Sequence, residues 1–159
     1  MQPVAPPISP PELGTEALKL MGRISRIHRR FYKIAGPVLE QELNIQLKEL
    51  LVFGAIARGH TQPSQISAVL GTPPPTTSRL LDQLTEAGYL KREPVPGDLR
   101  RCHMELTEHG QQTRTRALAL LSDTLGQELV RLQVPEDQLR ASLEQLNLLE
   151  LSLGIKEDE

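Results

Sequence analysis

The feature that most constrains the fold is a sharp break at Gly71-Thr72-Pro73, between two short segments, 64–70 and 74–88. In both segments, apolar or small residues recur at three- and four-residue steps, which is typical of the buried face of a helix. The residues predicted to share one core are Ile66, Leu70, Thr77, Leu81 and Leu84. Ser67, four residues before Gly71, is small enough to let two helices cross closely. The pattern predicts two short helices packed across a tight turn.

Longer helices are predicted before this pair. From Pro11 onward, apolar residues recur at helical steps, and Gly36-Pro37 is expected to stop the helix. A second stretch, 45–56, is apolar nearly all round, so we expect a central, buried helix that ends before Gly59. Residues 1–11 hold five of the 13 prolines and are interpreted as a flexible, proline-rich arm.

After Gly88 the spacing changes to that of strands. Two extended runs, 89–94 and 99–106, flank the proline- and glycine-containing residues 94–98, so a β-hairpin with a long loop is predicted. Thr107 suits the N-cap of a following helix, and Pro135 suits the start of a last one. The expected fold class is mainly α with a small β-wing.

Leucines between Ala117 and Leu153 lie on more than one face of the predicted C-terminal helices. A single chain would bury few of them at its end, which favours packing against a second copy of the chain. The predicted interface of this homodimer consists of dimerisation helices near both termini, 12–36 and 108–154.

The composition excludes several classes of protein. The formal net charge is −2, so nucleic-acid binding must use local patches. Cys102 is the only cysteine, which excludes an internal disulfide and a zinc site built on paired cysteines. No apolar run approaches the roughly 20 residues of a membrane span, and no secretory signal pattern is found, so a cytoplasmic protein without membrane contact is expected. The absence of a nucleophile paired with a base, a phosphate-binding glycine loop or a ligand cluster argues against an enzyme, a metal or a cofactor.

The second short helix has a face suited to reading a DNA groove. With Pro74 in its first turn, this helix exposes together Pro75, Thr76, Arg79 and Gln83. Arginine can donate two hydrogen bonds to a guanine edge, and threonine and proline suit the thymine methyl group. The alternative is a solvated Arg79 that pairs with Asp82 or Gln83 on the helix surface.

Five short motifs follow one another between residues 60 and 110. They are Leu70-Gly71, Thr76–Leu84, Ala87–Leu90, Gly97–Arg101 and Leu106–Gly110. Together they resemble the MarR (multiple antibiotic resistance regulator) family, whose wing signature is Asp-x-Arg with a later Leu-Thr-x-x-Gly. Two positions depart from that pattern. Prolines 73–75 replace the more common serine or threonine, so that a capping hydroxyl must come from Thr72 if at all, and Leu99 replaces an arginine.

The resemblance implies an obligate, triangular homodimer, in which residues 37–107 form a winged helix-turn-helix domain flanked by the dimerisation helices. In such proteins the recognition helix enters the major groove, and a wing arginine, here Arg100 paired with Asp98, reaches the minor groove. Residues at the start of the preceding helix contact phosphates. The expected DNA-contacting residues are Ser64, Gln65, Pro75, Thr76, Ser78, Arg79, Gln83, Asp98, Arg100 and Arg101. Two-fold symmetry predicts a pseudo-palindromic site with half-sites about 10 base pairs apart.

The function expected from these features is a homodimeric transcription repressor that binds double-stranded DNA and is relieved by a small-molecule effector. Many relatives bind a small aromatic or phenolic anion between the dimer helices and the winged domain. The candidate pocket residues are His28, Phe31, Tyr32, Leu47 and Leu51, which core packing explains equally well. The alternative function is a winged-helix protein-interaction module without sequence-specific DNA binding. Residues 61–107 hold five basic and five acidic side chains, which predicts modest non-specific affinity for DNA.

Overall fold

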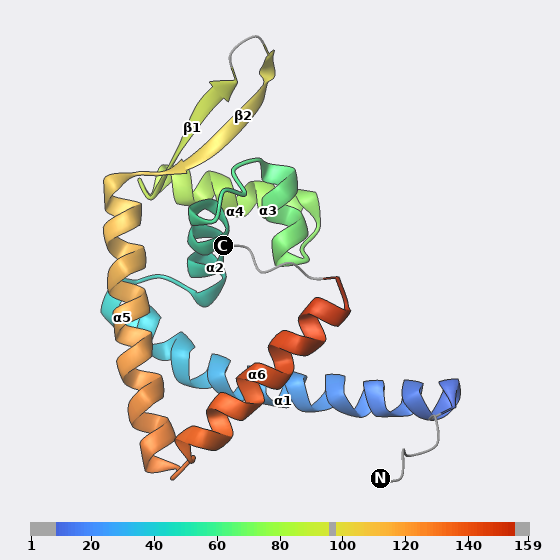
Figure 1. Ribbon diagram of the computed structural model, residues 1–159. Coiled ribbons are helices and arrows are strands. Elements are labelled where there is room, and N and C mark those ends of the chain that lie inside the picture. Colours follow the sequence, from blue (N-terminus) through green and yellow to red (C-terminus); the bar gives the residue numbers. More distant parts are fainter. Residues whose placement is uncertain (1–8, 96–97, 155–159) are drawn as a thin grey trace.

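The computed structural model describes residues 9–95 and 98–154, and the side chains of 95–101 lie outside the described part. Most of the predicted proline-rich arm also lies outside it. The described residues form helices and one two-stranded antiparallel sheet (Figure 1). The elements are α1 (Pro10–Leu43), α2 (Leu47–Ala57), α3 (Pro63–Leu70), α4 (Pro74–Glu86), β1 (Leu90–Val95), β2 (Asp98–Leu106), α5 (Glu108–Arg131) and α6 (Glu136–Ser152). The predicted fold class, mainly α with a small β-wing, is confirmed.

Helix α1 continues through Gly36-Pro37 as far as Leu43, so the predicted helix end at residue 36 is wrong. A proline inside a helix removes one backbone hydrogen bond and is normally disruptive. Here Ala35 and Leu39, on either side of Pro37, are buried in the main core. Their burial stabilises the continuous helix, and the predicted domain boundary at 36/37 falls inside it.

The core forms around α2, as the apolar spacing of 45–56 predicted. Val52, Phe53 and Ala55 are fully buried, and α2 contacts α1, α3, α5 and β2. Other fully or nearly fully buried members of the core are Leu39, Ile45, Ile66, Leu81, Leu84, Leu90 and Met104. Because the helix-turn-helix and the wing share this core, close packing fixes their positions relative to each other.

The turn between α3 and α4 has the close crossing that the small Ser67 predicted. The Ser67 side chain is buried, and its hydroxyl donates a hydrogen bond to the Thr72 carbonyl oxygen at 2.6 Å. Gly71 takes the left-handed φ of 61° that ends α3. The Thr72 and Thr77 hydroxyls are hydrogen-bonded at 2.8 Å, and the N-cap position of α4 is Pro73. Thr72 therefore does not cap α4.

Strands β1 and β2 form the wing, which projects from the body of the molecule in Figure 1. At its base Leu90 pairs with Leu106. Met104 is fully buried, and Cys102 and Leu106 pack against the same core. The Met104 N–H donates to the Thr61 carbonyl oxygen at 2.7 Å, which attaches the wing to the segment before α3.

The wing returns to the body at the junction between β2 and α5. As predicted, Thr107 caps α5: its hydroxyl oxygen accepts the Gly110 N–H at 3.1 Å. The same hydroxyl donates to the Gly88 carbonyl oxygen at 2.7 Å. The Tyr89 ring stacks on His109 with a centroid separation of 4.8 Å. The connection that follows α4 is thus tied to the first turn of α5.

Helices α5 and α6 meet α1 in different ways. Helix α5 packs along α1, where the Arg30 guanidinium lies 2.8 Å from the Glu128 carboxylate. Helix α6 crosses α1 in Figure 1 but has no buried residue. Large apolar side chains remain exposed on both α1 and α6. For example, Leu18 of α1 is 71% exposed and Leu151 of α6 is 61% exposed. In the described part of the chain, no helix is long and apolar enough to cross a membrane.

Candidate nucleic-acid interface

The outward face of α4 carries several of the predicted DNA-contacting side chains. Thr77, Leu81 and Leu84 bury the opposite face against the core. The exposed predicted residues of α4 are Pro75, Thr76, Ser78, Arg79 and Gln83. Because side chains four residues apart lie on the same side of a helix, Pro75 and Arg79 lie one turn apart on this face. The structure therefore brings these predicted residues together on one exposed surface.

Arg79 is the exposed cation of that face. Among the described residues, no hydrogen bond or ion pair engages its guanidinium. Asp82, the partner considered as the alternative, instead forms an ion pair with Arg92 of β1. Sequence reasoning missed the ion pair between Asp82 and Arg92, which joins α4 to the wing. With no partner among the described residues, the five guanidinium N–H donors of Arg79 can bind a ligand.

The start of α3 presents the two residues predicted to contact phosphate. Ser64 and Gln65 are both exposed. The Gln65 side-chain oxygen accepts a hydrogen bond from the Gln62 backbone N–H at 3.0 Å, so this oxygen helps to cap the helix. The Gln65 amide NH₂ remains a possible donor to phosphate. Phosphate contact stays a prediction for both residues.

The wing holds less free positive charge than its sequence suggests. The Lys91 ammonium lies 2.8 Å from the Glu105 carboxylate and 3.0 Å from that of Glu93. The hydrogen bond to Glu105 is the larger cause that raises the pKa of Lys91, and the hydrogen bond to Glu93 is the next. The predicted wing residues Asp98, Arg100 and Arg101 have side chains outside the described part, although their backbone belongs to β2.

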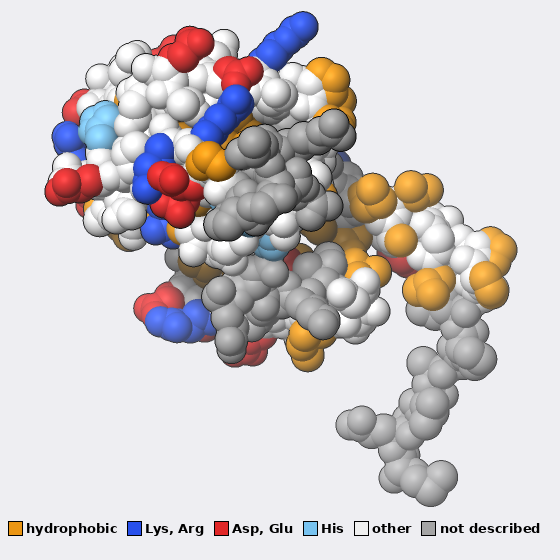
Figure 2. Space-filling model, turned by 90° about the horizontal axis from the view of Figure 1, so that it is seen from above, with side chains coloured by type: hydrophobic (Ala, Val, Ile, Leu, Met, Phe, Trp, Pro, Cys, Tyr) orange, Lys and Arg blue, Asp and Glu red, His pale blue; other side chains and the backbone are white. Residues whose placement is uncertain are grey.

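Figure 2 views the molecule from above, which is the wing side of Figure 1. Lys, Arg, Asp and Glu side chains lie next to one another on this face, and no large area of one sign is visible. The mixed surface agrees with the equal numbers of acidic and basic residues in 61–107. Selective contact to an anionic polymer must therefore depend on the placement of individual side chains.

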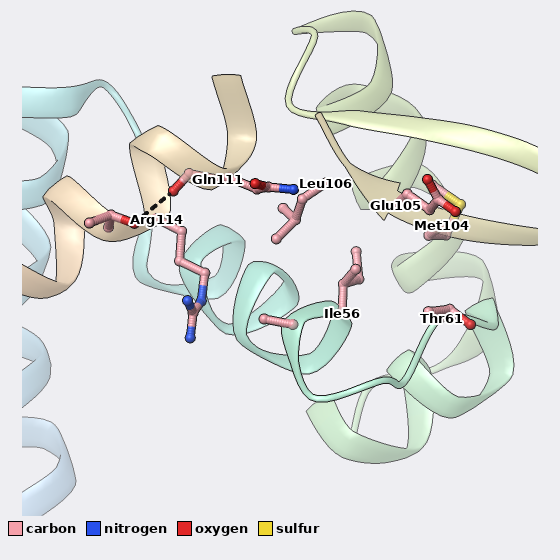
Figure 3. Close-up of a pocket in the computed structure, with 9 residues that line it drawn as sticks. Ile56, Thr61, Met104, Glu105, Leu106, Gln111 and Arg114 are labelled. Atoms are coloured by element: carbon pink, nitrogen blue, oxygen red, sulfur yellow. Dashed lines mark hydrogen bonds between the residues drawn. The ribbon is translucent and has the colours of Figure 1, made fainter. Parts of the chain in front are cut away.

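A cavity of about 450 Å³ lies at the base of the wing, between α2, β2 and α5 (Figure 3). Its lining includes Ile56, Thr61, Met104, Leu106, Gln111 and Arg114. Figure 3 shows Arg114 reaching from α5 towards α2, and its Nε atom is buried without a hydrogen-bond partner among the described residues. The guanidinium group carries a positive charge and several N–H donors, which suit an acceptor group in this cavity. Sequence reasoning missed Arg114, whose one signal was its place between Thr113 and Ala117 of the buried face.

The residues predicted for an effector pocket are only partly brought together. Tyr32 and Leu47 line a separate hollow of about 430 Å³ between α1 and α2. The His28 ring lies near that of Tyr32, with centroids 6.3 Å apart. Phe31 is half-buried, and Leu51 is exposed. His28, Phe31 and Leu51 do not line this hollow. None of the five predicted pocket residues lines the cavity beside Arg114.

Comparison with known proteins identifies the central part of the chain. Residues 43–101 match the model of the MarR family. The transcriptional regulator PecS of Dickeya dadantii is 28% identical over 104 residues, which cover 63% of this chain and 62% of PecS. The transcriptional repressor MprA of Escherichia coli is 33% identical over 79 residues, covering 49% of this chain and 45% of MprA. Each match spans less than two thirds of the relative's own length.

Solved structures match over more of the chain. Apo MarR from E. coli superimposes with a TM-score of 0.72 at 24% identity, covering 80% of this chain and 95% of MarR. A cysteine-to-serine mutant of E. coli MarR complexed with operator DNA superimposes with a TM-score of 0.69 at 23% identity. The match covers 84% of this chain and 95% of that mutant. Staphylococcus aureus MarR in complex with salicylate and kanamycin superimposes with a TM-score of 0.70 at 23% identity. The match covers 89% of this chain and 95% of that MarR chain. The central sequence, residues 43–101, thus matches the MarR family, and the described residues have the winged helix-turn-helix fold of solved MarR structures.

Proposed function

We propose that this chain is a sequence-specific transcription regulator that binds double-stranded DNA as a homodimer. The observation that carries the proposal is the exposed guanidinium of Arg79, which no described residue engages, on a helix whose opposite face is fixed in the core. The likeness of the fold to a MarR structure that contains operator DNA supports this assignment.

In this proposal α4 enters the major groove. Arg79 donates two hydrogen bonds to O6 and N7 of a guanine, and Gln83, one turn further along, is suited to an adenine edge. The hydroxyls of Thr76 and Ser78 lie to either side of this line and are suited to the phosphates, which position the helix without reading sequence. The Asp82–Arg92 ion pair would hold the wing at a defined angle to α4.

A second copy of the chain would cover the apolar surface of α1 and α6. The groove between these helices has a volume of about 720 Å³ and is lined by apolar residues that include Leu20, Ile24, Ile27, Leu146 and Leu149. Hydrophobic side chains also gather on the protruding N-terminal end of α1 (Figure 2). Exposed apolar surface of this extent favours association. A two-fold dimer would bind a pseudo-palindrome with half-sites about 10 base pairs apart.

A small anion that enters the cavity beside Arg114 would act as the effector. A carboxylate there would accept charge-assisted hydrogen bonds from the guanidinium of Arg114, which lines the cavity. The cavity is bounded by β2 and α5, so a bound anion would change how the wing sits on the dimerisation helices. We infer that the regulator is a repressor whose DNA affinity falls on effector binding. Because S. aureus MarR binds salicylate, salicylate is the first small anion to test as an effector.

Selection of bound sequences from random DNA duplexes tests the proposed function. The expected result is one enriched pseudo-palindrome, with the same sequence in both half-sites. The purified protein with Arg79→Ala provides the control, because it should enrich a less defined site. Selection that enriches no sequence would contradict DNA reading and favour a winged helix whose α4 face contacts a protein partner.

A further inference from the structure

The first turn of α4 has no free backbone N–H group. Prolines 73, 74 and 75 have none. The N–H groups of Thr76 and Thr77 both donate to the Pro73 carbonyl oxygen, at 2.9 and 3.1 Å. Helix starts usually present unpaired N–H groups, which bind phosphates and other acceptors. This helix start instead offers proline rings, so any base that it touches is met by an apolar surface.

Prolines 73, 74 and 75 are all exposed, and Pro75 is the one that lies in line with Arg79 on the outward face of the helix. It lies four residues before Arg79, so the two side chains follow one another along the same line of the helix. Pro74 lies in line with Leu81 instead, seven residues on, towards the side that packs on the core. A proline ring has almost no rotamer freedom to lose on contact. Pro75 therefore forms a rigid apolar contact point beside the proposed guanine-reading arginine.

The chemistry of Pro75 matches one base better than the others. Thymine alone among the four standard bases presents a methyl group in the major groove. A ring with neither donor nor acceptor packs favourably on that methyl group. Against the amino group of cytosine or the N7 acceptor of a purine, the same ring displaces water without replacing its hydrogen bonds, which costs free energy.

We propose that Pro75 determines sequence specificity by packing on the C5-methyl group of a thymine in each half-site, next along the groove to the base read by Arg79. This inference rests on the proposed function and adds a base preference to it. Because the contact is to the methyl group, 5-methylcytosine provides the same contact at that position, whereas uracil and cytosine do not.

The test uses the parent protein and its selected duplex, with each thymine replaced in turn by deoxyuridine, which removes only the methyl group. We expect one symmetric thymine position at which this replacement weakens binding, roughly fourfold for one half-site and roughly fifteenfold for both. At the same position 5-methylcytosine should bind better than cytosine by a similar factor. Substitution of Pro75→Ser should make thymine and deoxyuridine duplexes equivalent, whereas the matched control Pro74→Ser should keep the difference.

The deoxyuridine series needs no variant, so the absence of any methyl effect overturns the inference even if Pro75→Ser folds poorly, and Pro75→Ser assigns an observed effect to Pro75. If binding is insensitive to the methyl group at every thymine, or if Pro75→Ser discriminates as the parent does, the inference is wrong while the proposed function stands. A selection that enriches no sequence contradicts both. The two failures are therefore distinguishable.

Discussion

A Cβ atom on Gly110 would lie 2.2 Å from the carbonyl oxygen of Tyr89. The first turn of α5 and the connection after α4 approach each other here through backbone atoms, so a side chain at this position would force them apart. Steric crowding thus explains the glycine of the Leu-Thr-x-x-Gly motif, and the junction that it closes joins the connection after α4 to the first turn of α5.

Substitution of Gly110→Ala should lower the free energy of unfolding by about 1–3 kcal/mol, because the backbone at Tyr89 must shift. Gly126→Ala is the matched control on the same helix. A Cβ there meets nothing within 4 Å, and alanine should raise stability by about 0.5–1 kcal/mol. Urea unfolding at one fixed protein concentration measures both. Equal effects of the two substitutions would contradict the steric account.

Loss of the Thr107 cap should also be measurable. Thr107→Ala removes the acceptor of the Gly110 N–H and the donor to Gly88, and should cost about 1 kcal/mol. Thr107→Ser retains the hydroxyl and should recover most of this stability. Thermal unfolding of the three proteins gives the comparison, and a serine variant no more stable than the alanine variant would show that the hydroxyl does not matter.

The ion pair between Glu128 and Arg131 within α5, to which Arg30 of α1 adds, predicts a dependence of stability on pH. Two hydrogen bonds of 2.7 Å from Arg131, assisted by Arg30, lower the pKa of Glu128 from 4.5 to about 2. In the unfolded chain this carboxyl binds a proton at higher pH than in the folded state, so its contribution to stability is present above pH 4.5 and is lost as pH falls towards 2.

Glu128→Gln should therefore lower stability at neutral pH and flatten the fall in stability between about pH 5 and pH 2. Glu136→Gln removes an ion pair with Arg140 that is exposed on both sides, and it should change little. Urea unfolding across this pH range tests the pair. A Glu128 variant with the pH dependence of the parent would rule out the lowered pKa.

The proposed effector cavity predicts a change in regulation without a change in DNA binding itself. Arg114→Leu should retain the affinity of the parent for the selected duplex but lose the decrease caused by salicylate. Arg116→Leu, an exposed position on the same helix, should respond as the parent does. Fluorescence anisotropy of labelled duplex with and without salicylate measures this. Full release of the Arg114 variant by salicylate would exclude this cavity as the effector site.

The helix-turn-helix could be predicted from the sequence because its determinants are local. The small Ser67, the left-handed Gly71 and the prolines that begin α4 act within a few residues, and they give the observed turn. The buried residues of α4 follow a simple helical period, which also identified its exposed face. Local rules are reliable where the deciding contacts are close in sequence.

The remaining features depend on contacts between distant segments. The end of α1 was mispredicted because burial of Ala35 and Leu39 outweighs the local effect of Pro37. The cavity beside Arg114 was missed because its walls come from α2, β2 and α5, which no single periodicity relates. The same holds for the ion pair between Asp82 and Arg92.

The central claim is that Arg79 reads a base, and its most direct test is the affinity of parent and Arg79→Ala for the selected duplex and all of its single-base variants. Arg79→Ala should lose about 1–3 kcal/mol on the selected duplex and should lose discrimination at one symmetric base pair only. A variant that binds the selected duplex as tightly as the parent, or that weakens equally on every sequence, would contradict the account.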